Sequence, residues 1–259
     1  MAKFVGVAEP LSGPGFEAAL AELGVGMAEL VAVLKVESKT CGFLPSRRPK
    51  ILYERHVFHR LTAGRFSGAN PDISNPLAGG YAGDEKEYPR LEKAVKLDRT
   101  AALKSASWGA GQVMGENHKM VGYDDVETMV AAMQASEDEQ LRAVANFIKS
   151  KKLVDALRNH DWAAFARGYN GASYAKNKYD LMLHAKYNEV LTGTLPDLNV
   201  RAAQLYLSFL GYVLGEADGL YGRRSRAAVV EFKLANGLSG GERVDRALLE
   251  ALRAKVAAL

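Results

Sequence analysis

The sequence predicts a mainly α protein in two parts. Apolar residues recur at helical spacing through most of the first 195 residues, whereas alternating strand patterns are scarce. A turn-rich seam, TGTLPDLN at 192–199, precedes a shorter segment with three further helical patterns. Because 259 residues suffice for a larger and a smaller domain, we predict one domain at 1–195 and a second at 196–259.

Two short helices open the first part. The first is predicted at about 15–23, where apolar residues recur at helical spacing and Gly24 is a typical helix stop. The second, MAELVAVLKVES at 27–38, follows at once. In it Glu37 falls three residues after Leu34, so its carboxyl group continues the apolar stripe.

Burial gives Glu37 a possible chemical role. A carboxyl group held against hydrocarbon loses hydration in its charged form, so its pKa rises and it can donate a proton near neutral pH. This is what a general acid requires. The alternative is that Glu37 merely ends the helix.

A second acid, Glu54, stands in the apolar stretch KILYERHVF at 50–58. It shares a face with Phe58 under either a strand or a helix period, so both periods direct it inward. The alternative is a local salt bridge between Glu54 and Arg55 or His56.

Loops surround both acids. Pro45 and Pro49 interrupt regular structure between them, which predicts a loop that returns the chain across the Glu37 carboxyl group. Residues 61–89 are dense in Gly, Pro, Asn and Asp, and a long segment of this kind is more often a binding loop than an idle connection. Disorder is the alternative, against which its apolar residues argue: Phe66, Ile73, Leu77 and Tyr81.

Helical patterns then return and continue to the seam. Ser136, followed by Glu139 three residues later, forms a capping box that predicts a helix at 137–150. Two short helices follow, the second capped by Asp161 and stopped at Gly168. The remaining patterns lie at 88–107 and 179–191.

Composition narrows the function classes. The net charge of +4 comes with no concentrated basic block, which argues against nucleic acid as a partner. The single cysteine, Cys41, excludes an internal disulfide, and no apolar run reaches the length of a signal peptide or a membrane span. We therefore expect synthesis in the cytoplasm. No metal or other cofactor is predicted, because the histidines show no paired ligand spacing: His56, His59, His118, His160 and His184.

The second part resembles the three-helix peptidoglycan-binding domain found on many cell-wall hydrolases. The resemblance covers nearly the whole segment and rests on a first helix ending in LGY, the DGLYG turn at 218–222, the helix RAAVVEFKLANGL and a closing helix after VD. A plain helical bundle for protein contact is the alternative. The cationic last helix could also contact a membrane, but its apolar residues better suit the inner face of a small domain.

The first part, from about Ala28 to Leu191, resembles phage endolysin muramidases of the lysozyme-like superfamily. The resemblance rests on VLKVESKTCGF, ILYERHVFHRL, SASWGAGQVMGEN and FARGYNG, in that order. It implies a lysozyme-like α-rich catalytic domain that cleaves the β-1,4 bond between N-acetylmuramic acid and N-acetylglucosamine. By this resemblance Glu37 is the catalytic acid and Glu54 the second carboxyl group.

Three further residues suit an amino sugar by chemistry. Gln112, Tyr169 and Asn170 offer amide and phenol groups that match sugar hydroxyls and N-acetyl groups. Each could instead satisfy a backbone group. Two rival functions remain, a lytic transglycosylase that leaves 1,6-anhydro ends and a non-catalytic wall-binding protein.

The resemblance also implies a setting. We expect a monomeric endolysin, made in the host cytoplasm, that reaches the periplasmic peptidoglycan of a Gram-negative cell after release through the inner membrane, without stable membrane insertion. Deleting the residues after Pro196 should weaken binding to sacculi more than cleavage of soluble glycan.

Overall fold

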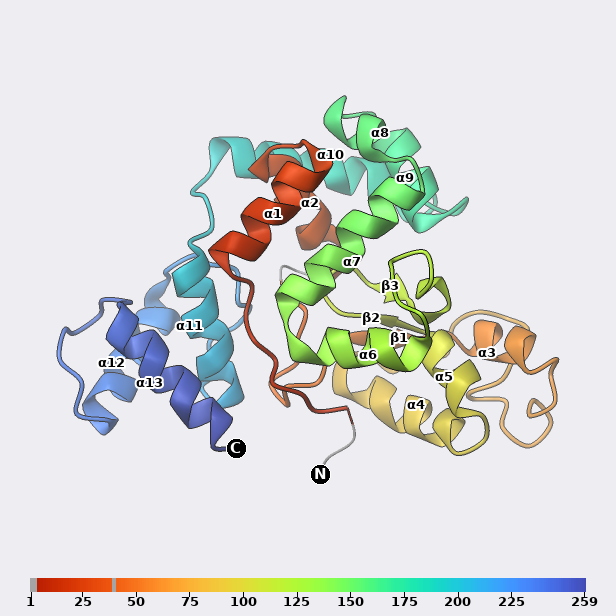
Figure 1. The fold of residues 1–259 in the computed structure, drawn as a ribbon, viewed down its shortest axis with the longest axis horizontal. Helices are drawn as coiled ribbons and strands as arrows, with labels where there is room; N and C mark the ends of the chain where they lie inside the picture. The colour runs from red at the N-terminus through yellow and green to blue at the C-terminus, as the bar shows by residue number, and fades with distance from the viewer. Residues whose placement is uncertain (1–3, 39–40) are drawn as a thin grey trace.

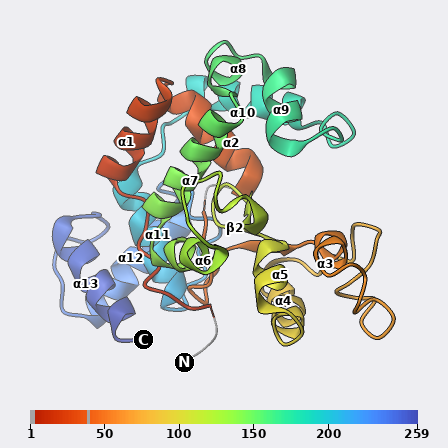
Figure 2. The same cartoon turned by 45° about the vertical axis from the view of Figure 1, so that its right-hand side comes forward.

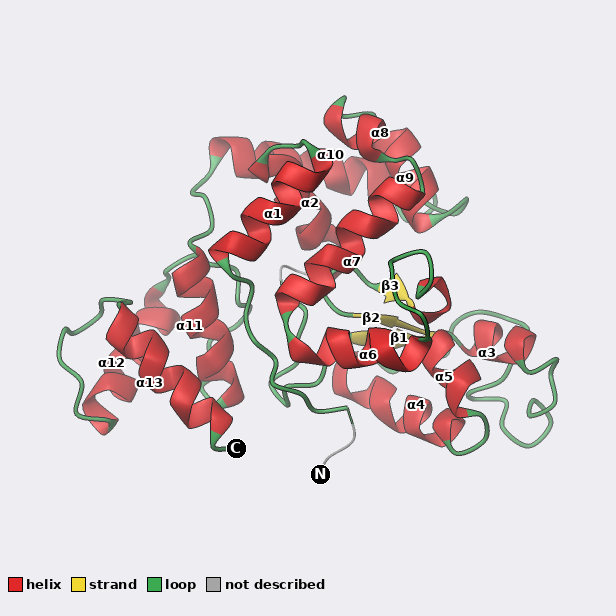
Figure 3. Ribbon diagram, in the orientation of Figure 1, coloured by secondary structure: helices red, strands yellow, loops and turns green. Residues whose placement is uncertain are grey.

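The computed structural model describes residues 4–38 and 41–259, and it confirms the mainly α fold class (Figures 1 and 3). The helices of the first part are α1 Gly13–Leu23, α2 Met27–Ser38, α3 Arg55–Leu61, α4 Glu87–Val95, α5 Arg99–Lys104, α6 Val126–Ala135, α7 Glu137–Ser150, α8 Val154–Arg158, α9 Trp162–Asn170 and α10 Tyr179–Thr192. Two short 3-10 helices are η1 Asp84–Lys86 and η2 Gly115–Asn117. The last three helices are α11 Leu198–Phe209, α12 Arg223–Ala235 and α13 Arg246–Ala257.

A small antiparallel sheet lies at the centre of the first part. Its strands are β1 Ile51–Tyr53, β2 Ala106–Trp108 and β3 Val113–Met114, hydrogen-bonded in the order β1-β2-β3. Strands this short cannot display a period of two, which is why the sequence did not reveal them. The stretch around Glu54 combines both predicted periods, because β1 ends and α3 begins on either side of that residue.

Several helix ends match their sequence signals. Gly24 ends α1 in the left-handed conformation with φ of 59°, and the Ser136 hydroxyl accepts a hydrogen bond from the Glu139 amide at the start of α7. The predicted stop at Gly168 is wrong, since α9 continues to Asn170. A Cβ at position 168 would lie 2.3 Å from a Leu153 methyl carbon, so this glycine permits α9 to pack closely against Leu153, the residue before α8, and does not end the helix.

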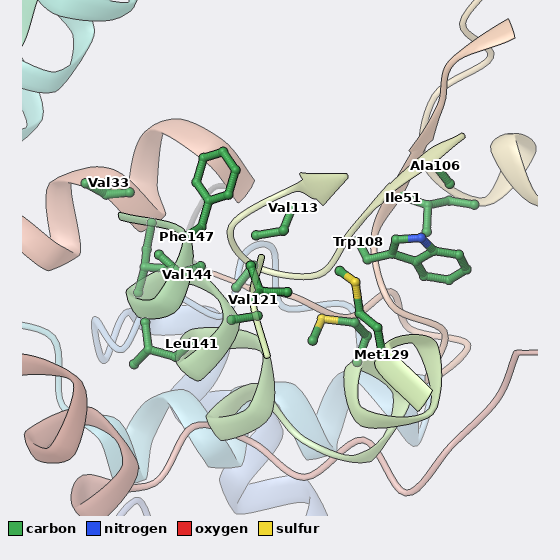
Figure 4. Packing of buried hydrophobic residues seen from close by; sticks show 14 of the residues in the cluster. Val33, Ile51, Ala106, Trp108, Val113, Val121, Met129, Leu141, Val144 and Phe147 are labelled. Carbon is green, nitrogen blue, oxygen red and sulfur yellow. The ribbon is translucent and has the colours of Figure 1, made fainter. Parts of the chain in front are cut away.

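The main core joins the sheet to the surrounding helices. Figure 4 shows Trp108 and Val113, from the hairpin that β2 and β3 form, beside Met129 of α6 and Val144 of α7. All four residues are buried. Close packing of this kind fixes the hairpin against α7. Since β1 pairs with β2, the core also fixes the residue that follows β1, which is Glu54.

Helices α11 to α13 form a separate three-helix group, with α3 to α5 on the opposite side of the molecule (Figures 1 and 2). Ala228, Val229 and Phe232 are buried on one face of α12, as predicted. The apolar cluster of this group also takes in Cys41 and Phe43 from the first part of the chain. The two parts therefore share buried surface.

Within the described residues, no helix is long and apolar enough to cross a membrane.

Candidate active site

A cleft with a volume of about 810 Å³ runs between the two parts of the molecule. It is lined by residues from the end of α2, from the sheet, from the end of α9 and the start of α10, and from the three-helix group. All five residues singled out from the sequence line it: Glu37, Glu54, Gln112, Tyr169 and Asn170. The fold thus gathers side chains that are more than a hundred residues apart in sequence.

Glu37 lies in the last turn of α2, where its half-buried side chain faces the cleft. Burial raises the pKa of Glu37 to about 7. The negative end of the helix dipole at this position also disfavours a carboxylate. A hydrogen bond from Asn170 opposes the rise, because Nδ2 donates to Glu37 Oε1 over 2.8 Å. Glu37 is therefore protonated in a large fraction of molecules near neutral pH, as a general acid requires.

Asn170 is the last residue of α9, and its side-chain oxygen has no hydrogen-bond partner among the described residues. Its Nδ2 is engaged by Glu37, while its Oδ1 is buried and accepts no hydrogen bond from any described residue. A buried amide oxygen without a donor is unfavourable in the isolated protein. It is an acceptor that an N–H or O–H of a bound sugar can satisfy.

Glu54 is fixed at the junction of β1 and α3. Its backbone N–H donates to Ser105 O over 2.8 Å, and its side chain is 16% exposed. The Tyr81 hydroxyl lies 3.0 Å from both carboxylate oxygens and donates to them. His56 Nδ1 lies 3.1 Å from Oε2 but does not reach hydrogen-bond geometry. Of the two salt-bridge partners that the alternative interpretation named, Arg55 and His56, only His56 lies beside the carboxylate.

Arg55, the other partner named in that alternative, holds the loop that carries Tyr81. Its guanidinium donates to Leu77 O over 2.9 Å and to Ala78 O over 3.2 Å. On the far side of the loop, the buried Glu87 carboxylate accepts from the backbone of residues 82 and 83. Burial and the Glu54 charge raise the pKa of Tyr81 to about 12, so its hydroxyl stays a donor. The predicted binding loop is thus ordered, and it positions a donor for Glu54.

Gln112 and Tyr169 bind protein groups. The Gln112 side-chain Nε2 donates to Gly109 O over 2.8 Å and to Lys50 O over 3.3 Å, and its Oε1 accepts from Ser107. The Tyr169 hydroxyl donates to Gly111 O over 2.8 Å. For these two residues the backbone alternative describes the observed contacts. Tyr169 thereby joins α9 to the β2–β3 connection, whereas Gln112 joins that connection to Lys50, the residue before β1.

Comparison with models of known protein families assigns the chain to a family. The model of the N-acetylmuramidase family matches residues 26–191, which is more than half of the chain. The chain belongs to the N-acetylmuramidase family. A second model, described as a putative peptidoglycan-binding domain, matches residues 196–252. This muramidase is therefore a lysozyme-type glycoside hydrolase whose substrate is peptidoglycan.

A solved structure agrees with this assignment. The crystal structure of an endolysin from Burkholderia AP3 phage is 43% identical in sequence, with a TM-score of 0.64. The match covers 70% of the muramidase and 71% of the endolysin chain. A search of curated protein sequences found no match. Together with the two family models, the likeness identifies the muramidase as an endolysin-type peptidoglycan hydrolase.

Sequence reasoning missed two tyrosines, Tyr81, which donates to the Glu54 carboxylate, and Tyr179, which lines the cleft. By residue type Tyr81 is one more apolar residue of its loop, but its place among glycines, in GGYAG, is a signal of special conformation. Tyr179, the first residue of α10, lines the cleft, and burial together with the Glu37 charge raises its pKa. No local pattern distinguishes Tyr179, because its place beside Glu37 depends on the packing of α10 against α2.

The contact between Asn170 and Glu37 predicts a shift in the pH profile. In an Asn170→Leu variant the carboxylate loses a hydrogen bond, so the pKa of Glu37 rises above about 7. We expect the alkaline limb of kcat/KM to move upward by about one pH unit. Arg167→Leu, on the exposed side of α9, is the control and should leave the limb in place. An alkaline limb that stays or moves downward in Asn170→Leu contradicts this role.

Proposed function

We propose that the muramidase hydrolyses the β-1,4 bond between N-acetylmuramic acid and N-acetylglucosamine. The observation that carries this proposal is one cleft holding a carboxyl group with a pKa of about 7, Glu37, and a second carboxyl group fixed by a tyrosine hydroxyl, Glu54. Glycoside hydrolysis uses two carboxyl groups in different protonation states.

Each group has a defined task in the proposed reaction. Glu37 donates its proton to the glycosidic oxygen as the bond from that oxygen to the anomeric carbon breaks. Glu54 takes a proton from the water that adds to the anomeric carbon. Asn170 keeps the Glu37 carboxyl group oriented, and Tyr81 does the same for Glu54. Glu37 then regains a proton from solvent and Glu54 releases its proton to solvent, which restores the starting state.

A variant of Glu54 tests the second role. Glu54→Gln keeps the shape of the side chain but cannot accept the proton, so we expect a loss of about 10²- to 10⁴-fold in kcat on purified peptidoglycan. Binding to sacculi should be unchanged. Glu116→Gln, whose carboxylate pairs with Arg60 and does not line the cleft, is the matched control and should keep full activity.

Product analysis distinguishes hydrolysis from its rivals. Mass spectrometry of digested sacculi should show reducing ends that have gained water. Anhydro ends, together with near-normal rates in Glu54→Gln, would instead assign the protein as a lytic transglycosylase with Glu37 as its one essential carboxyl group. Equal lysis by wild type and Glu37→Gln would remove Glu37 as the acid.

We extend the proposal to the setting in which the enzyme acts. The likeness to an endolysin of a Burkholderia phage supports a role in host lysis, with synthesis in the host cytoplasm and action on the periplasmic peptidoglycan of a Gram-negative cell. We further propose that the protein is a monomer. We also propose that its two domains meet between residues 195 and 196, a boundary that the ranges of the two family models support. Lysis of cells with a permeabilised outer membrane, and light scattering of the purified chain, test the host class and the oligomeric state.

A further inference from the structure

The three-helix group reaches the cleft that holds the two carboxyl groups. Leu205 and Ser208 of α11, and residues 215–217 of the α11–α12 connection, line the same cavity as Glu37 and Glu54. A domain that serves only to hold the enzyme near the wall has no need to lie there. Its position suggests a part in binding the strand that is cut.

Buried contacts fix the three-helix group in this position. Arg201 of α11 makes two hydrogen bonds to the Glu137 carboxylate, of 2.5 and 2.7 Å, and the two side chains are only 4% and 2% exposed. The Phe209 ring meets Phe43 edge-on, with centroids 6.4 Å apart. Buried charges and rings do not separate easily, so the group is a fixed wall rather than a tethered module.

A second set of contacts lies near the chain termini. Glu9 accepts from the Tyr206 hydroxyl over 2.7 Å and pairs with Arg253 of α13 over 2.8 Å. Arg47 donates to Val256 O over 3.1 Å. The first and last helices of the group are thus both attached to the larger part, which prevents rotation about a single contact.

The geometry points to a composite substrate cleft, in which the peptidoglycan-binding domain supplies a binding surface for the glycan strand beyond the bond that is cut. This inference rests on the proposed function. A glycan is a continuous chain, so sugar units on either side of the scissile bond must follow the cleft away from Glu37 and Glu54. Ser208 and Gly215 of the three-helix group, together with Leu44 and Pro45 of the larger part, line this cleft and offer small neutral and apolar groups suited to the faces of sugar rings.

A reversible block of this wall tests the inference in the full-length protein. We would label a Ser208→Cys variant, after folding, with a methanethiosulfonate reagent that carries a bulky aromatic group. The substrate is soluble, peptide-free glycan strands, which removes any contribution from stem peptides or from tethering to an insoluble wall. We expect labelling to lower kcat/KM at least tenfold, mainly through KM, and reduction with dithiothreitol to restore it.

Matched controls separate the wall from its surroundings. Val213, on the same α11–α12 connection as residues 215–217, is 88% exposed and does not line the cleft. Labelling of a Val213→Cys variant should therefore have no effect on kcat/KM. Wild type treated with the same reagent measures any effect of labelling the native cysteine, Cys41. Glu216→Cys, at an exposed position that also lines the cleft, serves if Ser208→Cys does not fold.

The outcomes are distinguishable from failure of the proposed function. If wild type does not cleave the strands, the proposed hydrolysis fails, whatever the labelled variants do. If wild type cleaves them and labelled Ser208→Cys is equally active, the composite cleft is overturned. Failure of the folded Ser208→Cys protein to react with the reagent also overturns it, because the position is then closed to the cleft.

Discussion

Replacing Glu37 by Gln is expected to abolish lysis, with a loss of at least about 10³-fold in kcat on purified peptidoglycan. The amide cannot donate a proton to the glycosidic oxygen, whereas its oxygen can still accept the hydrogen bond that Asn170 now gives to Oε1. The shape of the cleft and binding to sacculi should therefore persist. Turbidity loss and soluble-product release measure the effect, and Glu116→Gln is again the control.

The same substitution is expected to stabilise the protein at neutral pH. The pKa of Glu37 is raised from 4.5 to about 7, so the native state holds its proton more tightly than the unfolded state does. Between these values stability falls as pH rises, and Gln removes that loss. At about 1.4 kcal/mol per pKa unit the full shift is worth about 3 kcal/mol. Because the side chain is partly exposed, we expect a gain of about 1–2 kcal/mol.

The pH dependence of this gain is the sharper measurement. Wild type and Glu37→Gln should have equal free energies of unfolding below pH 4.5, diverge as pH rises toward about 7, and remain separated above it. Urea titrations at three pH values suffice. A variant that is inactive but destabilised at pH 8 would indicate that Glu37 acts through structure and not as the acid.

How much the sequence predicted depends on how local each feature is. The spacing of Glu37 from Leu34 predicted a carboxyl group beside apolar residues, because a helix repeats within one segment of chain. The capping box at Ser136 predicted the start of α7 for the same reason. In the second part, the DGLYG turn behaves as expected, with Asp218 Oδ1 accepting from the Leu220 amide over 2.9 Å.

Contacts between distant segments could not be predicted. The chemistry of Gln112 and Tyr169 suited a sugar, but their partners Lys50 and Gly111 are brought to them only by the folded sheet and α9. The donor that fixes Glu54 comes from Tyr81, 27 residues away, across a loop without a periodic pattern. Chemistry can be inferred from residue type, whereas the choice between a substrate and a backbone partner requires the fold.

Glu137 is the clearest case of a residue whose role was hidden. The sequence presents it as the first residue of a capped helix, yet its buried carboxylate accepts from the Leu11 and Gly42 amides as well as from Arg201. Burial acts to raise its pKa, but the charge and hydrogen bonds of Arg201 hold the pKa of Glu137 below its ordinary value. The sequence predicts that deleting the residues after Pro196 weakens binding to sacculi more than cleavage of soluble glycan, and the structure adds that this deletion would also leave the Glu137 charge buried without Arg201.

An Arg201→Met variant is expected to lose about 3–5 kcal/mol of stability at neutral pH, because the Glu137 charge stays buried without its cation. Chemical denaturation monitored by tryptophan fluorescence measures this loss. Arg246→Met is the control, since Arg246 also pairs with a carboxylate at 2.7 Å but on the surface, and its free energy of unfolding should not change.

The difference in free energy of unfolding between wild type and Arg201→Met should decrease as pH falls. Wild type loses the contribution of Glu137 as pH falls below 4.5 and through its lowered native pKa. In the variant, burial without Arg201 raises the native pKa instead, so protonation relieves its penalty at a higher pH. Adding Glu137→Gln should recover part of the loss at neutral pH, since the amide oxygen can still accept from one of the two backbone donors. Equal stability losses at pH 4 and pH 7, with no recovery in the double variant, would mean that Arg201 stabilises the domain contact through packing alone and not through its charge.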